Sequence, residues 1–379
     1  MLPSFTDEQR LLRESIERFR QQDYAFEKRK ALLAKLGSKD DPLWKQFAEL
    51  GWLAATLPEE HGGLGGSHAD LAIMMEQFGR GLMTSPFVPT IVLGGTILQL
   101  AANEAQKSAI LPDVAEGRAK LALAYLEPPA QPDPAIVATR AEHDGDGFVI
   151  TGEKVAVLYG NVADHLLVSA RTSGHVGDRT GISLFLVASD APGLTIDSYR
   201  THDDGWAADL RFDQVRVPTE AVIGSVGAGL ATLEAALDAG TAAICAEAVG
   251  AMWSLHDMTL DYIKVRKQFS AAIGSFQAIQ HRMVNMYMKC QLAQSMALAG
   301  MAALDAVDPV ARNRAVSAAK VQVGRAARHV GEEAIQLHGG IAMTDEYAAG
   351  HYFKRLTMIR LMFGDENYHL WRYRQIASD

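Results

Sequence analysis

The strongest constraint on the fold is the length of three helical stretches in the second half of the chain. Residues 228–268, 275–305 and 309–337 each carry apolar residues at three- and four-residue spacing, the period of an amphipathic helix. Each stretch far exceeds the usual globular helix of about 11 residues. A fourth helical stretch contains the sequence HYFKRLTMIRLMF. Because long helices joined by short connections pack antiparallel, the pattern predicts an antiparallel four-helix bundle.

The ends of these stretches carry residues that typically begin or end helices. Asp308 followed by Pro309 is a start signal, and Ser275 marks the start of the preceding stretch. Gly339 and Gly340 indicate a stop. The bundle is therefore expected to consist of separate helices joined by short turns.

The middle of the chain has a different period. Residues 121–224 contain short runs rich in β-branched and aromatic residues, such as ISLFLVA and ADLRFDQVRV, and several runs alternate apolar with polar residues. The dipeptides Asp144-Gly145 and Asp146-Gly147 supply turn residues of the kind found in hairpins. We expect a small antiparallel β-barrel or sheet.

The first part of the chain is expected to be helical. Thr6 and Gln9 form a capping box, Asp41 and Pro42 open the window DPLWKQFAELG, and HADLAIMMEQFGR is a further helical window. The expected fold class is α+β multidomain. Its expected parts are an N-terminal all-α domain (1–118), a middle β domain (119–225) and a C-terminal helical-bundle domain (226–379).

Composition excludes several classes of function. The net charge is −9 without a Lys/Arg run, which argues against nucleic acid as a partner. The two cysteines, Cys245 and Cys290, lack a CxxC motif, so we expect neither a disulfide framework nor a metal site. The N-terminus lacks the apolar run of a secretory signal, and the most apolar window, 233–252, contains three carboxylates. We expect a cytoplasmic protein with no membrane span.

Two patterns in the bundle could bind a ligand. Arg266 ends one long helical stretch and Gln277 follows the start of the next, and a helix N-terminus beside an arginine suits a phosphate. Gln336 precedes Gly339 and Gly340, where the backbone could approach a flat or anionic group closely. Taken alone, a helix hairpin with a solvated arginine and a glycine helix cap account for both patterns.

In combination and in this order, these patterns resemble the acyl-CoA dehydrogenase family. The bundle motifs are RKQF, FQAIQ and QLHGG, and the likeness extends to LPEEHGGLGGSHADL, DGDGFVITGEK and FDQVRVPTEAVIG, which together span almost the whole chain. The segments AICAEAVGAM and GHYFKRLTMI are similar to the small subunits of pimeloyl-CoA-type dehydrogenases. The resemblance implies a flavoprotein of fatty acid metabolism that uses FAD to oxidise an acyl-CoA substrate to 2-enoyl-CoA and passes electrons to an electron-transfer flavoprotein.

Removal of an α-proton from a thioester needs a positioned carboxylate. The resemblance implies a glutamate at one of two places, which are Phe363 and Gly240 here. Asp365 and Glu366 follow on the same loop and are the candidate catalytic replacements, although they could equally cap or solvate a helix start. Asp238 matches a family aspartate near the substrate channel, which implies a role in substrate binding.

The family pattern for the flavin-ring site is also altered. The resemblance places threonine and serine where this chain has Leu126 and Pro132, and a W-I-T triplet where it has residues 156–158, Ala-Val-Leu. In the family FAD lies across a subunit interface, and a neighbouring subunit holds the adenosine and pyrophosphate end. In this chain, the residues that correspond to the contacts made to a neighbour's FAD are Arg266, Phe269, Gln277, Gln336, Gly339 and Gly340. We call them the FAD half-site.

The chain matches the family at the FAD contacts made to a neighbouring subunit but departs from it at the flavin-ring and glutamate positions. Three functions could follow from this difference. The first is a subunit of a hetero-oligomeric dehydrogenase that lends FAD contacts to a second, catalytic acyl-CoA dehydrogenase subunit. The second is a self-sufficient homodimer or tetramer that uses Asp365 or Glu366 as its base, or that performs chemistry without one. The third is a non-enzymatic scaffold that binds acyl-CoA or a partner and has lost flavin.

Overall fold

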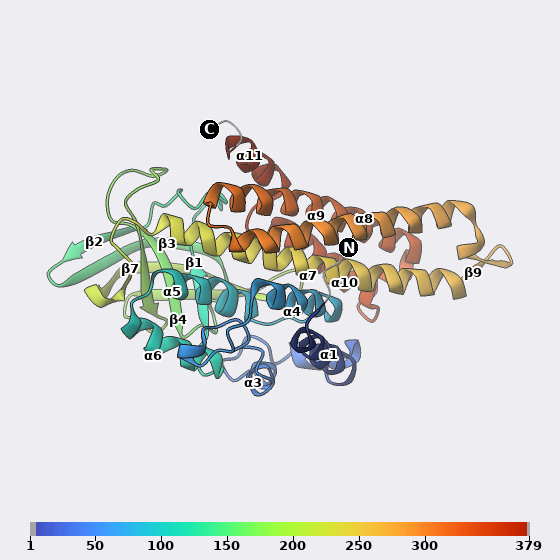
Figure 1. Ribbon diagram of the computed structural model, residues 1–379, viewed down its shortest axis with the longest axis horizontal. Coiled ribbons are helices and arrows are strands. Elements are labelled where there is room, and N and C mark those ends of the chain that lie inside the picture. Colours follow the sequence, from blue (N-terminus) through green and yellow to red (C-terminus); the bar gives the residue numbers. More distant parts are fainter. Residues whose placement is uncertain (1–4, 377–379) are drawn as a thin grey trace. The chain divides into compact units, whose positions relative to one another are not determined.

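The computed structural model describes residues 5–376 (Figure 1). The chain divides into two compact units, each assembled from separate segments. The first unit comprises residues 1–31, 68–83 and 241–379, and the second comprises residues 32–67 and 84–240.

The first unit is helical. In chain order its elements are α1 (Asp7–Gln22), most of α2 (Phe26–Leu33), α4 (His68–Gly81), most of α7 (Leu230–Val265), the short hairpin β9 (Lys267–Gln268) and β10 (Ala271–Ala272), α8 (Gln277–Ala302), α9 (Pro309–His338), α10 (Ala348–Leu361) and α11 (Glu366–Ile376). Figure 1 shows α8 running alongside α9. The predicted helical bundle is confirmed, with α7, α8 and α9 within three residues of their expected limits at each end.

A side-chain cap explains where α9 begins. The Asp308 carboxylate accepts hydrogen bonds from the amides of Val310 and Ala311, at 2.9 and 3.3 Å, as expected for the start of α9. The expected cap at Ser275 is wrong, because its hydroxyl donates to the Ala272 carbonyl at 2.6 Å and α8 begins two residues later. A residue that precedes a helix caps it only when its side chain turns toward the helix amides.

Two glycines allow helices α4 and α7 to approach closely. A Cβ atom on Gly79 would lie 1.8 Å from the Glu247 carbonyl oxygen, and a Cβ atom on Gly250 would lie 1.8 Å from the Glu76 carbonyl oxygen. Both values are far below any real contact, so only glycine fits at this crossing. The crossing fixes the position of α4 on α7 within the helical unit.

The second unit contains the sheet and short helices. The helices are α3 (Pro42–Glu49), the π-helix η2 (Val88–Gly94), α5 (Gly95–Ala101) and α6 (Glu104–Ala115). The strands are β1 (Leu121–Ala124), β2 (Arg140–Asp144), β3 (Gly147–Leu158), β4 (His165–Arg171), β5 (Ile182–Ala188), β6 (Leu194–Arg200), β7 (Trp206–Pro218) and β8 (Val222–Ile223). The strand order is β6-β7-β3-β2-β4-β5-β8, and β1 pairs with β4.

The sheet is mixed rather than purely antiparallel. The turn between β2 and β3 is the predicted hairpin, in which Asp144 pairs with Gly147. However, β1 and β2 each pair with β4 in parallel, which corrects the expected antiparallel arrangement. Parallel neighbours need a long connection rather than a tight turn. Residues 125–164, which include β2 and β3, provide that connection between β1 and β4.

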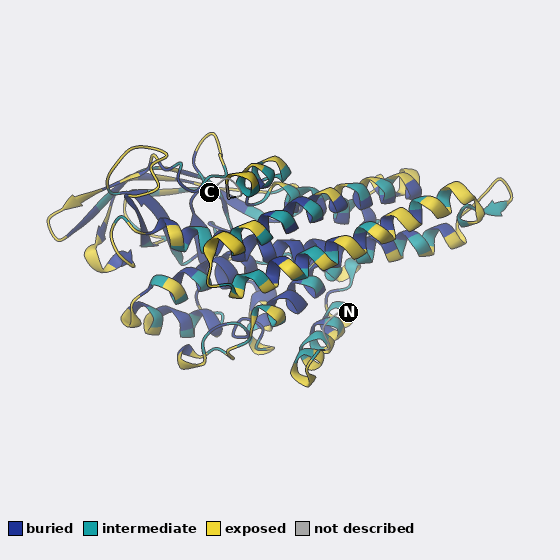
Figure 2. Ribbon diagram, turned by 45° about the horizontal axis from the view of Figure 1, so that its top comes forward, coloured by how far each residue is buried: buried dark blue, intermediate teal, exposed yellow. Residues whose placement is uncertain are grey.

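Helix α7 is the longest helix among the described residues, and it is apolar over most of its length. By length and composition it could cross a bilayer, and 94% of its most apolar window is buried. Figure 2 shows α7 largely in dark blue, whereas exposed residues in yellow lie along the outer side of α8. Both cysteines are free and buried in these helices, as expected for core packing.

Candidate functional site

One end of the helical bundle carries the six predicted cofactor contacts. Arg266, Phe269 and Gln277 lie in and around the β9–β10 hairpin that joins α7 to α8, and Gln336, Gly339 and Gly340 lie at the end of α9. An ion pair between Arg282 in α8 and Glu333 in α9 joins the two helices near this end. The structure therefore brings the six residues to the same end of the bundle.

Phe269 stands at the tip of the hairpin. Its side chain is 90% exposed, and its backbone has a φ of 53°, a strained conformation for an aromatic residue. Its nearest aromatic neighbour is Phe276, with ring centroids 6.4 Å apart in an edge-on arrangement. Strained backbone and large exposed rings are uncommon, and both features concentrate at sites that meet a ligand or partner.

Arg266 is held by its backbone and leaves its side chain exposed. Its amide donates to the Tyr262 carbonyl and its carbonyl accepts from the Ile273 amide, both at 2.9 Å. Within residues 5–376 no carboxylate forms an ion pair with its guanidinium. The bundle end thus offers an exposed guanidinium with five unused donors, which suits a phosphate group.

The double glycine at the end of α9 leaves open space. Gly339 has φ 66° and ψ −145°, a conformation essentially confined to glycine, and a Cβ atom at either Gly339 or Gly340 would meet nothing within 4 Å. No described contact therefore requires glycine at position 340. A group approaching from outside the chain would explain the glycine at position 340, whereas the backbone conformation already accounts for Gly339.

His338, just before these glycines, is a packed side chain. It is buried, its Nδ1 donates to the Ala334 carbonyl at 2.8 Å, and its ring lies 4.6 Å from Tyr262 and 5.2 Å from Tyr347. Burial lowers the pKa of this imidazole. A neutral ring packed against Tyr262 and Tyr347 positions the end of α9 rather than adding a positive charge to it.

Two buried residues, Lys320 and His369, form hydrogen bonds with the backbone of the loop that contains Phe363. The Lys320 ammonium donates to the carbonyls of Ile359 and Met362, the latter at 2.8 Å, and His369 Nε2 donates to the Phe363 carbonyl at 3.1 Å. Phe363 itself is buried and has a φ of 57°. Burial lowers the pKa of Lys320 to about 8. The sequence patterns did not indicate Lys320 or His369. The only signal in the sequence is that Lys320 is a lysine within an apolar helical stretch.

The two candidate carboxylates on this loop already have partners. Asp365 accepts a hydrogen bond from the Tyr368 amide at 2.9 Å and so caps α11. Glu366 forms a bidentate pair with Arg360, with Nε–Oε1 and Nη2–Oε2 distances of 2.8 and 3.3 Å. Glu366 would have to give up its pair with Arg360 to act as a base, whereas the cap at Asp365 uses only one of its two carboxylate oxygens.

The second expected glutamate position lies within α7. Gly240 and Asp238 are both buried. Because successive helical residues are 100° apart, two positions separated by two residues face nearly opposite sides of the helix. Asp238 therefore does not occupy the place of a side chain at position 240. Further along α7, Glu247 accepts hydrogen bonds from Nε and Nη2 of Arg355, at 2.6 and 2.7 Å.

In the sheet unit, the positions of the expected flavin-ring contacts carry apolar side chains. The amide of Val155 donates to the Leu126 carbonyl and the amide of Ala156 donates to Asp209, both at 2.9 Å. These two backbone donors are therefore already used. The side chains at positions 126, 132 and 156–158 add no hydroxyl, amide or charge.

A buried ion pair stabilises this region. Lys154 donates to Glu127 at 2.6 Å and to the Ser169 hydroxyl at 3.0 Å, while Glu127 also accepts from the amides of Ala138 and Thr139. Burial lowers the pKa of Lys154 to about 8. Burial alone would raise the pKa of Glu127, but Lys154 and the hydrogen bonds outweigh it and hold that pKa below its usual value. The pair is structural, since every polar group in it is satisfied.

Metal chemistry finds no support in the described residues. Between residues 5 and 376, no three His, Cys, Asp or Glu side chains come together in a group that could hold a metal ion. Burial raises the pKa of Cys245 to about 11 and that of Cys290 to about 12, so neither is a ready thiolate.

Comparisons with known proteins agree with this architecture. Family models of the acyl-CoA dehydrogenase N-terminal, middle and C-terminal domains match residues 6–118, 122–215 and 227–375. The probable acyl-CoA dehydrogenase YngJ of Bacillus subtilis is 32% identical over 349 residues, which cover 90% of each chain.

Two solved structures have closely similar folds. A variant of the Tcur3481-Tcur3483 steroid ACAD has 27% identity, covers 98% of each chain and gives a TM-score of 0.88. Butyryl-CoA dehydrogenase from Megasphaera elsdenii has 23% identity, covers 100% of each chain and gives a TM-score of 0.91, which shows the shared fold. The predicted fold class is confirmed, as are the predictions of an oxidoreductase and of FAD as its cofactor. The chain therefore belongs to the acyl-CoA dehydrogenase family of flavoproteins.

Proposed function

We propose that this chain is a subunit of a heteromeric dehydrogenase that introduces an α,β double bond into an acyl-CoA thioester. We further propose that it corresponds to the small subunit of the pimeloyl-CoA type, with domain limits of 1–118, 119–225 and 226–379. The observation that carries the proposal is an asymmetry. The bundle end has exposed groups that suit a dinucleotide, whereas the flavin-ring positions and residue 363, a phenylalanine, offer apolar side chains.

The FAD half-site of this chain would hold the phosphate and adenosine end of an FAD molecule whose flavin ring is bound by the partner subunit. Arg266 would bind the pyrophosphate, Phe269 would stack on a flat ring, and Gln277 and Gln336 would hydrogen-bond polar edges. The open space at residues 339–340 would let the backbone approach. When bound, FAD supplies the acceptor for a hydride from the β-carbon of the substrate.

The acid–base part of the reaction would come from the partner. Proton removal needs a carboxylate that is free to accept a proton. Phe363 and Gly240 offer none, and Asp365 and Glu366 are engaged as a helix cap and as the partner of Arg360. We assign Asp238 a substrate-positioning role, since it is buried in α7.

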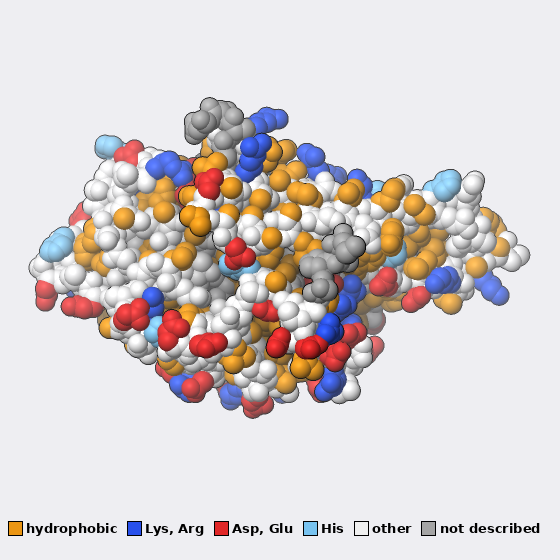
Figure 3. Space-filling view, in the orientation of Figure 1, with side chains coloured by type: hydrophobic (Ala, Val, Ile, Leu, Met, Phe, Trp, Pro, Cys, Tyr) orange, Lys and Arg blue, Asp and Glu red, His pale blue; other side chains and the backbone are white. Residues whose placement is uncertain are grey.

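An apolar stripe on α8 favours association through the bundle. Val284, Tyr287, Met288 and Leu292 recur at three- and four-residue spacing and are each 47–56% exposed. Figure 3 shows hydrophobic side chains, in orange, distributed over the bundle helices. Such a stripe is typical of an interface, here with the catalytic partner or with a second copy. We propose that the assembly works in the cytoplasm and passes its electrons to an electron-transfer flavoprotein.

The test is the visible absorption spectrum of the chain, purified alone and after co-expression with a glutamate-bearing relative. The proposal expects a colourless chain that acquires flavin, and bleaches with acyl-CoA, only in the complex. A yellow chain that bleaches alone would establish the self-sufficient enzyme and make Asp365 and Glu366 the residues to mutate. A chain without flavin in either preparation would favour the non-enzymatic scaffold.

A further inference from the structure

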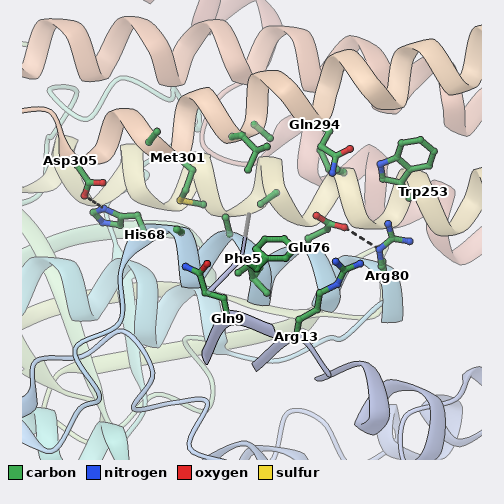
Figure 4. A pocket seen from close by; sticks show the side chains of 18 of the residues that line it. Phe5, Gln9, Arg13, His68, Glu76, Arg80, Trp253, Gln294, Met301 and Asp305 are labelled. Carbon is green, nitrogen blue, oxygen red and sulfur yellow. Dashed lines mark hydrogen bonds and ion pairs between the residues drawn. The ribbon is translucent and has the colours of Figure 1, made fainter. Parts of the chain in front are cut away.

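An elongated groove lies within the helical unit, apart from the residues assigned above. Its volume is about 820 Å³, and it runs between α1, α4, α7 and α8. Figure 4 shows α4 and α8 as its sides, α7 behind them and the first residues of α1 on the near side. None of the half-site residues lines it.

The groove exists because its walls carry small side chains. Ala72 of α4, Ala246 of α7 and Ala297 of α8 line its middle, together with Ile73, Val249 and Met301. Any of the alanines could be replaced by a larger apolar residue in a well-packed helix interface, which would close the space. The middle of the groove is therefore an apolar channel bounded by helices on several sides.

Charged groups are confined to the two ends. At one end His68 Nδ1 donates to Asp305 at 2.6 Å, and at the other Arg80 pairs with Glu76 at 3.1 Å. Asp257 also lines the groove; it is 59% exposed and lies 3.1 Å from His256. These acidic groups therefore all have basic neighbours.

Arg13 is the exception among the charged groups. Its guanidinium lies 5.6 Å from the centre of the Phe5 ring, and no carboxylate among residues 5–376 forms an ion pair with it. Figure 4 shows it at the same end as Arg80 and Glu76. One cation beside an apolar channel suits a ligand with a single negative head group.

The size of the groove suits a small molecule. Its volume of about 820 Å³ lies within the range of about 300–1,000 Å³ that is typical of small-molecule pockets.

We propose that this groove binds a fatty acid, with the alkyl chain along the alanine-lined middle and the carboxylate at Arg13. The Gln294 side chain, labelled near the same end in Figure 4, makes no hydrogen bond within the described part of the chain. The inference is independent of the FAD half-site and of any catalytic partner.

The test uses the full chain and displacement of a fluorescent fatty-acid probe, cis-parinaric acid. Saturated carboxylates of 8 to 16 carbons are compared with the alcohol and the amine of equal length. We expect saturable binding that tightens about four-fold per methylene until the groove is filled. We also expect the carboxylate to bind more tightly than the alcohol or the amine.

Two variants locate the site. Ala297→Phe should weaken binding of both the acid and the alcohol more than ten-fold, and its matched control is Ala299→Phe, at an exposed position of the same helix. Arg13→Gln should weaken only the acid, about ten-fold, with Arg18→Gln on α1 as control and partial rescue by Arg13→Lys. Circular dichroism checks that each variant is folded.

Several results would overturn the inference. Absence of saturable binding by any of the three ligands would remove the site. Equal effects of Ala297→Phe and Ala299→Phe would place binding elsewhere. Equal weakening of acid and alcohol by Arg13→Gln, or tighter binding of the amine, would remove the carboxylate assignment even if Ala297→Phe failed to fold.

Discussion

The Lys320 ammonium donates a hydrogen bond to the Met362 carbonyl at 2.8 Å, directly before Phe363. The same ammonium donates to the Ile359 carbonyl, so one buried cation holds both carbonyls where α10 ends. His369 adds a third bond, to the carbonyl of Phe363. Three hydrogen bonds therefore hold the backbone of the loop on which the family resemblance expects a catalytic glutamate. The side chain at that position, Phe363, is nevertheless apolar.

Lys320→Met tests the clamp, by which we mean the hydrogen bonds from Lys320 to the carbonyls of Ile359 and Met362. The variant leaves the carbonyls of Ile359 and Met362 without their donor, and we expect a loss of about 2 kcal/mol in the free energy of unfolding. The loss should be accompanied by faster amide hydrogen exchange in residues 359–366, measured by mass spectrometry. Unchanged exchange in this segment would show that Lys320 does not hold the loop.

His369 predicts a dependence of stability on pH. Burial, with Lys320 and Arg372 nearby, lowers the pKa of its imidazole from 6.5 to about 3. The unfolded chain therefore binds more protons than the folded chain between those values. The stabilisation is complete above pH 6.5 and is lost as the pH falls toward 3, by at most about 1.4 kcal/mol per pH unit.

Urea unfolding of the wild type and of His369→Gln, at intervals from pH 7 to pH 4, measures this contribution as a difference. The difference in unfolding free energy between the two proteins should shrink on acidification. A difference that is constant with pH would mean that His369 does not titrate in this window. Subtracting the variant also removes the contributions of other carboxyl and imidazole groups.

The extent to which sequence predicts this structure depends on how local each interaction is. The long helices follow from apolar spacing, and Asp308 caps α9 through amides only two and three residues away. Ser275 shows the limit of local prediction. Its hydroxyl can bond either an amide at the start of α8 or a preceding carbonyl, and it bonds the carbonyl of Ala272. Spacing alone does not decide between them.

Long-range pairing could not be predicted in the same way. The parallel pairing of β1 with β4 joins residues 44 positions apart in its first register pair, Leu121 with His165. The clamp of Lys320 on Met362 likewise depends on how α9 and α10 pack. At the bundle end, local patterns single out Arg266 and Gly339 but fit a helix hairpin and a helix cap equally well, and only the family resemblance gives them a role in binding FAD.

Two glycine substitutions should separate packing from ligand approach. At Gly250 a methyl group would strike the Glu76 carbonyl, and we expect Gly250→Ala to destabilise the fold by about 3 kcal/mol or more. At Gly340 a methyl group would meet nothing within 4 Å, so Gly340→Ala should leave the melting temperature unchanged. Under the proposed function it should nevertheless lower the flavin content of the complex. A destabilised Gly340→Ala protein would contradict the open space described here.

Arg266 provides the most direct test of the FAD half-site. Its guanidinium is exposed and has no carboxylate partner within the described residues, so Arg266→Ala should leave the free energy of unfolding within about 0.5 kcal/mol of the wild type. If the side chain binds a pyrophosphate held mainly by a partner, the loss of a charge-assisted contact should weaken FAD binding by the complex about ten-fold. The measurement is flavin absorbance per heterodimer after dilution, with Arg18→Ala, on exposed α1, as the matched control. Equal flavin occupancy in the two variants would remove the case for a half-site at this end of the bundle, whereas loss of flavin in Arg266→Ala alone would establish it.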